Sequence, residues 1–192
     1  MAEILYRNKD FIIINKPVPA DSEREVPALL EKEGIHGAKC FHRLDREVGG
    51  VMLLTLSPDA PKKLEGVPFT KEYTAEIIGC PAEKSGEMTD LLYHDRRTNK
   101  TFTVKKKRAG VKEAKLFYDV ISEGEKSLVR VRLVTGRTHQ IRVQFASRGM
   151  PVSGDGRYGG GKGVLKLFSS SLSFEWEGET VHIEKAPYWI ET

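Results

Sequence analysis

Apolar and polar residues alternate over short stretches along much of this chain, a pattern that predicts strands rather than long helices. Residues 4–15 predict two strands separated by the polar turn at residues 8–10. Residues 51–56 form an apolar run, which is typical of a strand buried on both faces. Strand patterns dominate again from residue 71 onward, and the C-terminal segment predicts hairpins around residues 177–179.

Helical patterns are fewer and shorter. Residues 23–33 predict a helix that ends at Gly34, and Pro58 is placed to open a short helix after the buried strand. Residues 138–148 predict another helix, because two apolar residues lie one turn apart before a Gly-Met-Pro stop. The pattern as a whole predicts a strand-rich α+β domain.

Length and composition narrow the class of protein. A chain of 192 residues with 39% apolar and 30% charged residues fits one compact domain, and it excludes a membrane span, a collagen-like repeat and wholesale disorder. The apolar run at residues 11–14 is too short for a signal peptide. Cys40 and Cys80 are too few for a disulfide framework, so we expect a cytoplasmic protein.

The charge is distributed unevenly. The net charge is only +4, but residues 100–115 carry seven basic residues and one acid, and residues 128–148 carry five arginines and no acid. If both stretches share one face, that face suits a polyanion. The alternative is that residues 105–108 form a solvated hairpin tip.

Several motif matches fail on inspection. Residues 154–163 imitate a dinucleotide fingerprint and a phosphate loop, but they lack the flanking strand and helix, and Gly163 stands where a phosphate loop needs a hydroxyl. A flexible loop is the better prediction. His36, Cys40 and His42 lack the second ligand pair of a zinc site, so we expect structural roles for them.

Two polar segments remain unexplained. Residues 41–50 place Asp45 in a turn between Arg43 and Arg46, where pairing with an arginine would keep the carboxylate ionised. The alternative is an ordinary surface turn with a salt bridge. Residues 133–142 end a strand in a glycine turn and a polar helix start, which suits binding of phosphate or carboxylate, or simply caps the helix.

These two segments together resemble a known family. His42-Arg43-Leu44-Asp45 followed by Gly50, and then Gly136-Arg137-Thr138-His139-Gln140-Ile141-Arg142, are similar to the signatures of the RluA-type pseudouridine synthases. Residues 71–75 resemble the family's second motif and residues 151–159 its stretch after the helix. The resemblance covers about residues 4–175.

The resemblance implies an isomerase that converts uridine within RNA to pseudouridine. It implies Asp45 as the essential carboxylate, Arg142 as its ion-pair partner, and Tyr73 as a residue that stacks on the base or moves a proton. Whether Asp45 attacks C1′, adds to C6 or removes the C2′ proton stays open. The reaction needs no metal or cofactor.

The chemistry requires the base to leave its stack, and the resemblance implies that Arg43 occupies the vacated space. We expect RNA phosphates to be held by Arg137, Lys105, Lys106, Lys107 and Arg108. The expected partner is ribosomal or transfer RNA, with no membrane and no obligate protein partner, and the expected state is a monomer.

The resemblance implies an α+β fold, a mixed and mainly antiparallel bent sheet with flanking helices and an RNA cleft across the sheet. We expect residues 1–192 to form a single catalytic domain without an accessory RNA-binding domain. Val48 and Gly49 replace the Thr-Ser of many members, so hydrogen bonds that brace the Asp45 turn are in question. The alternative function is therefore a catalytically silent RNA-binding protein, against which the presence of Asp45, Tyr73 and Arg142 weighs.

Overall fold

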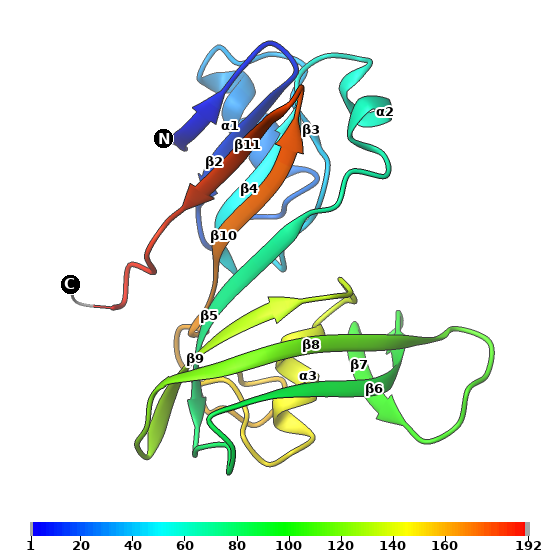
Figure 1. The fold of residues 1–192 in the computed structure, drawn as a ribbon, viewed down its shortest axis with the longest axis vertical. Coiled ribbons are helices and arrows are strands. Elements are labelled where there is room, and N and C mark those ends of the chain that lie inside the picture. Colours follow the sequence, from blue (N-terminus) through cyan, green and yellow to red (C-terminus); the bar gives the residue numbers. More distant parts are fainter. Residues whose placement is uncertain (1, 191–192) are drawn as a thin grey trace. The chain divides into compact units, whose positions relative to one another are not determined.

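Strands are the main regular secondary structure of residues 2–190, the part of the chain that the computed structural model describes (Figure 1). The contacts between residues divide the chain into two compact parts. Residues 2–71 and 168–190 form one, which we call the terminal part, and residues 72–167 form the other, the central part.

The terminal part is built around a buried strand. Its strands are β1 (Glu3–Arg7), β2 (Phe11–Lys16), β3 (Lys39–Cys40), β4 (Gly49–Thr55), β10 (Leu167–Trp176) and β11 (Glu179–Glu184), and its helices are α1 (Glu25–Lys32) and α2 (Ala60–Leu64). β4 pairs antiparallel with β2 and parallel with β10, and all of its residues are buried. This is why residues 51–56 read as an apolar run.

Aromatic rings fill the core of the terminal part. The ring of Phe11 lies 5.2 Å from Trp176 and 5.5 Å from Phe174, measured between centroids. Leu53 belongs to the same buried cluster. Burial of such side chains is the main force that holds β2, β4 and β10 together.

The central part is a second set of paired strands with one helix. Its elements are β5 (Thr70–Ile78), β6 (Ser85–Asp95), β7 (Lys100–Val104), β8 (Val111–Ser122), β9 (Lys126–Leu133) and α3 (Gln140–Ala146). The strand order is β5-β9-β8-β6-β7, and the β8/β9, β6/β8 and β6/β7 pairs are antiparallel.

Most of the predicted elements are confirmed. The strand pair at residues 4–15, the helix that ends before Gly34, the buried strand and the hairpin at residues 177–179 all occur. The short helix begins at Ala60 rather than at Pro58. The mixed sheet confirms the α+β prediction, while the single-domain assignment stays a prediction.

Among residues 2–190, no helix is both long enough and apolar enough to span a bilayer.

Candidate active site

Asp45 lies half-buried in the turn between β3 and β4. The backbone amide of Val48 donates to the carbonyl of Asp45 at 3.0 Å, which closes the turn. The buried Ser22 hydroxyl accepts from the amide of Leu44 at 3.0 Å and donates to the Leu44 carbonyl at 2.8 Å. The backbone on both sides of Asp45 is therefore held by hydrogen bonds.

Lys16 at the end of β2 supports the Asp45 turn, a role that the sequence reasoning did not assign to it. Its buried Nζ donates to the carbonyls of Ala20 at 2.7 Å, Pro17 at 3.1 Å and Arg46 at 3.3 Å. Burial lowers the pKa of Lys16 to about 8, and the Asp45 carboxylate is the strongest of the charges that raise it. The available signal was a lysine that ends a strand whose first four residues are apolar.

The replacement of Thr-Ser by Val48 and Gly49 does not leave the turn without support. Ser22 and Lys16 supply the hydrogen bonds described above. A side chain at position 49 would crowd the carbonyl of Lys16 at 3.2 Å and the Val18 side chain at 3.3 Å. Glycine at this position therefore permits the close packing of β4 on β2.

The arginines that flank Asp45 each contact a glutamate. Arg43 contacts Glu23 at 3.4 Å and Arg46 contacts Glu25 at 2.8 Å. Glutamates at and before the start of α1 lie within reach of both guanidinium groups, and pairing of an arginine with Asp45 stays a prediction. The Arg43 side chain stays 62% exposed.

His42 and Cys40 have structural contacts. The Nε2 atom of His42 accepts the Leu53 amide at 3.2 Å, and burial lowers the pKa of His42 well below 6.5. Burial also raises the pKa of the Cys40 thiol to about 11 and lowers the pKa of Lys71 to about 8. Within residues 2–190, no group of three His, Cys, Asp or Glu side chains is placed to hold a metal.

In the central part, Arg142 is buried on α3 against Asp155. Its Nε donates to Oδ2 of Asp155 at 2.6 Å and its Nη2 to Oδ1 at 2.9 Å. The guanidinium also lies over the ring of Tyr158, 5.3 Å from its centroid. These contacts fix both the position and the plane of the guanidinium group.

Asp155 also organises the glycine-rich loop at residues 154–163. Its Oδ1 accepts from the amides of Arg157 at 3.1 Å and Tyr158 at 3.3 Å. The prediction of a loop rather than a nucleotide motif is confirmed. Gly160 serves close packing, because a side chain at this position would collide with the backbone of Val152.

Tyr158 connects Arg142 to His139. The Tyr158 hydroxyl lies 2.9 Å from Nδ1 of His139 and accepts the Thr101 amide at 2.8 Å. His139 has a positive φ of 55° at the start of α3, a conformation that few non-glycine residues adopt. The motif histidine is thus part of the hydrogen-bonded support of the helix.

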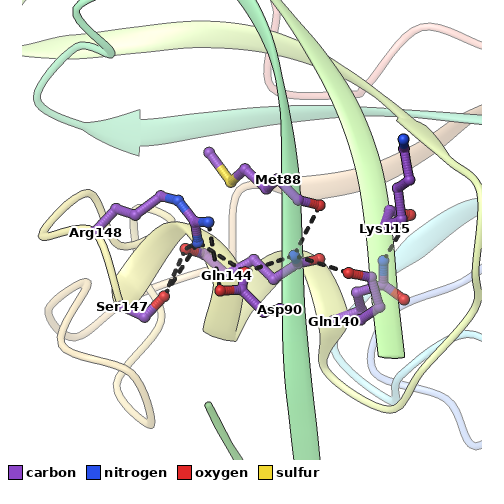
Figure 2. A network of polar contacts seen from close by, with 8 residues as sticks. Met88, Asp90, Lys115, Gln140, Gln144, Ser147 and Arg148 are labelled. Atoms are coloured by element: carbon purple, nitrogen blue, oxygen red, sulfur yellow. Dashed lines mark hydrogen bonds and ion pairs between the residues drawn. The ribbon is translucent and has the colours of Figure 1, made fainter. Parts of the chain in front are cut away.

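Polar contacts anchor α3 to the strands β6 and β8 (Figure 2). Nε2 of Gln144 donates to the Met88 carbonyl at 3.2 Å and to Oδ2 of Asp90 at 2.8 Å. Arg148 contacts the same Asp90 oxygen at 2.8 Å, and Gln140 donates to the Lys115 carbonyl at 3.1 Å. The helix that carries Arg142 is therefore held at several points along its length.

The predicted site residues are distributed over both parts of the chain. Asp45 and Arg43 lie in the terminal part. Tyr73 is buried on β5 and Arg142 on α3, both in the central part. Arg137 is half-buried before α3, and residues 105–108 are exposed between β7 and β8. That these residues serve one site stays a prediction.

Comparison with known proteins identifies the family. The sequence model of RNA pseudouridylate synthases matches residues 10–147. The chain belongs to this family. It is 31% identical over 169 residues to the dual-specificity RNA pseudouridine synthase RluA of Yersinia pestis, with 81% of each chain covered. The predicted RluA-type resemblance is confirmed.

Two further relatives extend the comparison. An uncharacterized RNA pseudouridine synthase of Bacillus subtilis, YhcT, is 31% identical over 182 residues, which cover 85% of this chain. This chain spans only 59% of the length of that relative. The structure of human RNA pseudouridylate synthase domain containing 1 matches the fold with a TM-score of 0.85 at 22% identity, covering 99% of this chain and 85% of that one.

Proposed function

We propose that this pseudouridine synthase family member isomerises specific uridines in ribosomal or transfer RNA, with Asp45 as the essential carboxylate. The observation that carries the proposal is the construction of the Asp45 turn. Lys16 and Ser22 fix its backbone from within the core, although an ordinary surface turn needs no such support. One relative is named a ribosomal large subunit pseudouridine synthase, which supports ribosomal RNA as a substrate class.

The reaction leaves the elemental composition of the uridine unchanged, because one hydrogen is lost to solvent and one is gained. The bond between N1 and C1′ breaks, the uracil turns, a bond forms between C5 and C1′, and the hydrogen on C5 is lost to solvent while N1 gains one. Asp45 acts in this isomerisation as a nucleophile or as a base.

Arg142 is proposed as the cation that pairs with Asp45. The contacts to Asp155 and Tyr158 support this role, because they hold a buried guanidinium in one orientation. A preset guanidinium loses little freedom when it binds a second carboxylate.

Tyr73 is proposed to contact the extruded base, and Arg43 to take the place of that base in the RNA. The exposure of Arg43 supports this assignment. Arg137 and the exposed residues 105–108 are proposed to bind phosphates. We further propose that the protein acts as a monomer in the cytoplasm, in line with two unpaired cysteines.

Tritium release tests the proposed activity. RNA labelled at C5 of uridine, from cells that lack this gene, should release tritium to water when the wild-type protein is added. Asp45→Asn should lower the rate by about 1,000-fold or more while RNA affinity stays within a few-fold. Asp59→Asn makes the same chemical change at an exposed position and should leave the rate unchanged.

The outcome also separates the two candidate functions. Tritium release by the wild type and its loss in Asp45→Asn would establish the enzyme. RNA binding without release by the wild type would identify the silent RNA-binding protein instead.

A further inference from the structure

A cavity of about 620 Å³ lies in the central part, between the end of β6, the start of β8 and the turn that precedes α3. Neither Tyr73 nor Arg142 lines it, so it is distinct from the residues proposed for catalysis in this part. Thr138 does line it, and α3 begins two residues later.

The cavity is strongly basic. Its lining includes four cationic side chains: Arg96, Arg97, Lys112 and Arg137. Asp95 is the one acid in the lining, and its carboxylate accepts the Arg97 amide at 2.9 Å and the Thr98 hydroxyl at 2.9 Å. In the described part of the chain, the exposed side chains of Arg96, Arg97 and Lys112 form no ion pair. An anionic ligand would therefore meet four cations and one carboxylate, that of Asp95, which leaves an excess of positive charge.

Contacts with the rest of the central part hold the walls in place. Nη1 of Arg157 donates to the carbonyls of Thr98 and Asn99, both at 3.0 Å, which fixes the turn that carries the arginines. On the opposite wall, Nε of Arg137 donates to the Glu113 carbonyl at 3.0 Å. The backbone of the arginine turn and the side chain of Arg137 are thus placed before a ligand arrives, which lowers the entropy cost of binding.

The other walls suit a base and a sugar. Leu92 and Tyr93 contribute apolar surface, and His94 contributes a polar ring whose Nδ1 lies 3.0 Å from the Thr101 hydroxyl. The volume falls within the range of about 300–1,000 Å³ of pockets that enclose small ligands, and exceeds what a phosphate alone requires. A basic pocket with apolar and ring surface fits a nucleotide.

We propose that this cavity binds one unpaired nucleotide of the RNA substrate, with its phosphate near Arg96 and Arg97. The inference rests on the proposed function and adds a recognition site for RNA outside the target uridine. The Thr101 hydroxyl donates to the Thr138 carbonyl at 2.8 Å, which joins the cavity wall to the start of α3. A nucleotide in the cavity would set the RNA strand beside the helix that carries Arg142.

Two variants test the site by different means. Arg96→Ala with Arg97→Ala removes charge, and Ala109→Trp fills the cavity from an exposed position in its lining without changing charge. Lys9→Ala with Lys32→Ala removes the same charge from exposed positions in the terminal part. The probes are a fluorescein-labelled single-stranded RNA of about 12 nucleotides, a length that such surfaces cover, and its duplex.

We expect the arginine pair and Ala109→Trp each to weaken binding of the single strand about 10-fold, while Ala109→Trp leaves duplex binding within about 2-fold. Lys9→Ala with Lys32→Ala should change neither single-strand binding nor duplex binding. The cavity assignment is overturned if Ala109→Trp binds the single strand as the wild type does, or if the arginine pair loses no more than the control pair. Tritium release distinguishes a failure of the cavity assignment from a failure of the proposed function. Normal release with unaffected binding overturns the cavity alone, whereas absence of release from the wild type overturns the proposed function.

Discussion

At the residue scale, the buried pair of Arg142 and Asp155 sets the strictest requirement on the fold. Both Asp155 oxygens accept from the guanidinium, and both side chains are almost fully buried. Asp155→Asn would leave a buried cation facing a neutral amide, which should lower the free energy of unfolding by about 3 kcal/mol. Urea unfolding measures this change.

Asp59→Asn is the matched control, because its carboxylate is exposed and should be replaceable without loss of stability. An Asp155→Asn variant as stable as the wild type would contradict the assigned role of the pair.

The burial of His42 predicts that the free energy of unfolding depends on pH. Burial holds the pKa of His42 well below 6.5 in the folded chain, so between that value and 6.5 only the unfolded chain binds the proton. Stability is therefore lost as the pH falls below about 6.5, with a slope that approaches 1.4 kcal/mol per pH unit.

His42→Gln keeps a side-chain acceptor for the Leu53 amide but does not titrate. The difference in unfolding free energy between wild type and variant should shrink as the pH is lowered from about 7 to about 5. His182→Gln, at a half-exposed position, should show no such trend. A flat difference curve for His42→Gln would mean that His42 binds a proton as readily in the folded chain as in the unfolded chain, which would contradict the effect of burial.

The sequence indicated most of the residues that matter, but it did not indicate which groups their side chains contact. Asp45 and Arg142 stand out because charged groups occur inside motif segments. Asp155 was not recognised as the Arg142 partner, because it lies thirteen residues away in a glycine-rich loop that has no periodic pattern. Lys16 was missed as well, because its three carbonyl acceptors are backbone groups that a sequence does not reveal.

At the scale of elements, the loop at residues 154–163 depends on glycine at one position more than at another. A Cβ at Gly160 would collide with the Val152 carbonyl, whereas a Cβ at Gly156 would meet only ordinary contact at 3.6 Å. Gly160→Ala should lower the free energy of unfolding by about 1–3 kcal/mol. Gly156→Ala should be neutral or slightly stabilising. Equal stability of the two variants in urea would contradict this packing.

The sequence predicted the positions of helices and strands better than it predicted which strands pair. Alternation and glycine stops located α1, β2 and β4 within a few residues. The order β5-β9-β8-β6-β7 could not be predicted, because several amphipathic strands could satisfy the same alternation and long-range packing chooses among them.

At the scale of the whole molecule, the uneven charge predicts how the protein binds RNA. Lys106 and Lys107 are exposed between β7 and β8. Lys106→Glu with Lys107→Glu should weaken RNA binding at least about 10-fold and flatten its dependence on salt. Lys9→Glu with Lys32→Glu makes the same charge change in the terminal part and should have a smaller effect. Equal salt slopes for the two variants would identify residues 105–108 as a solvated loop.

The central claim is that Asp45 catalyses formation of pseudouridine in RNA. The most direct test maps pseudouridine in total RNA from source cells with and without this gene. The account predicts that at least one pseudouridine disappears, returns with the wild-type gene and does not return with Asp45→Asn. Full restoration by Asp45→Asn, or a map that the gene leaves unchanged, would contradict it.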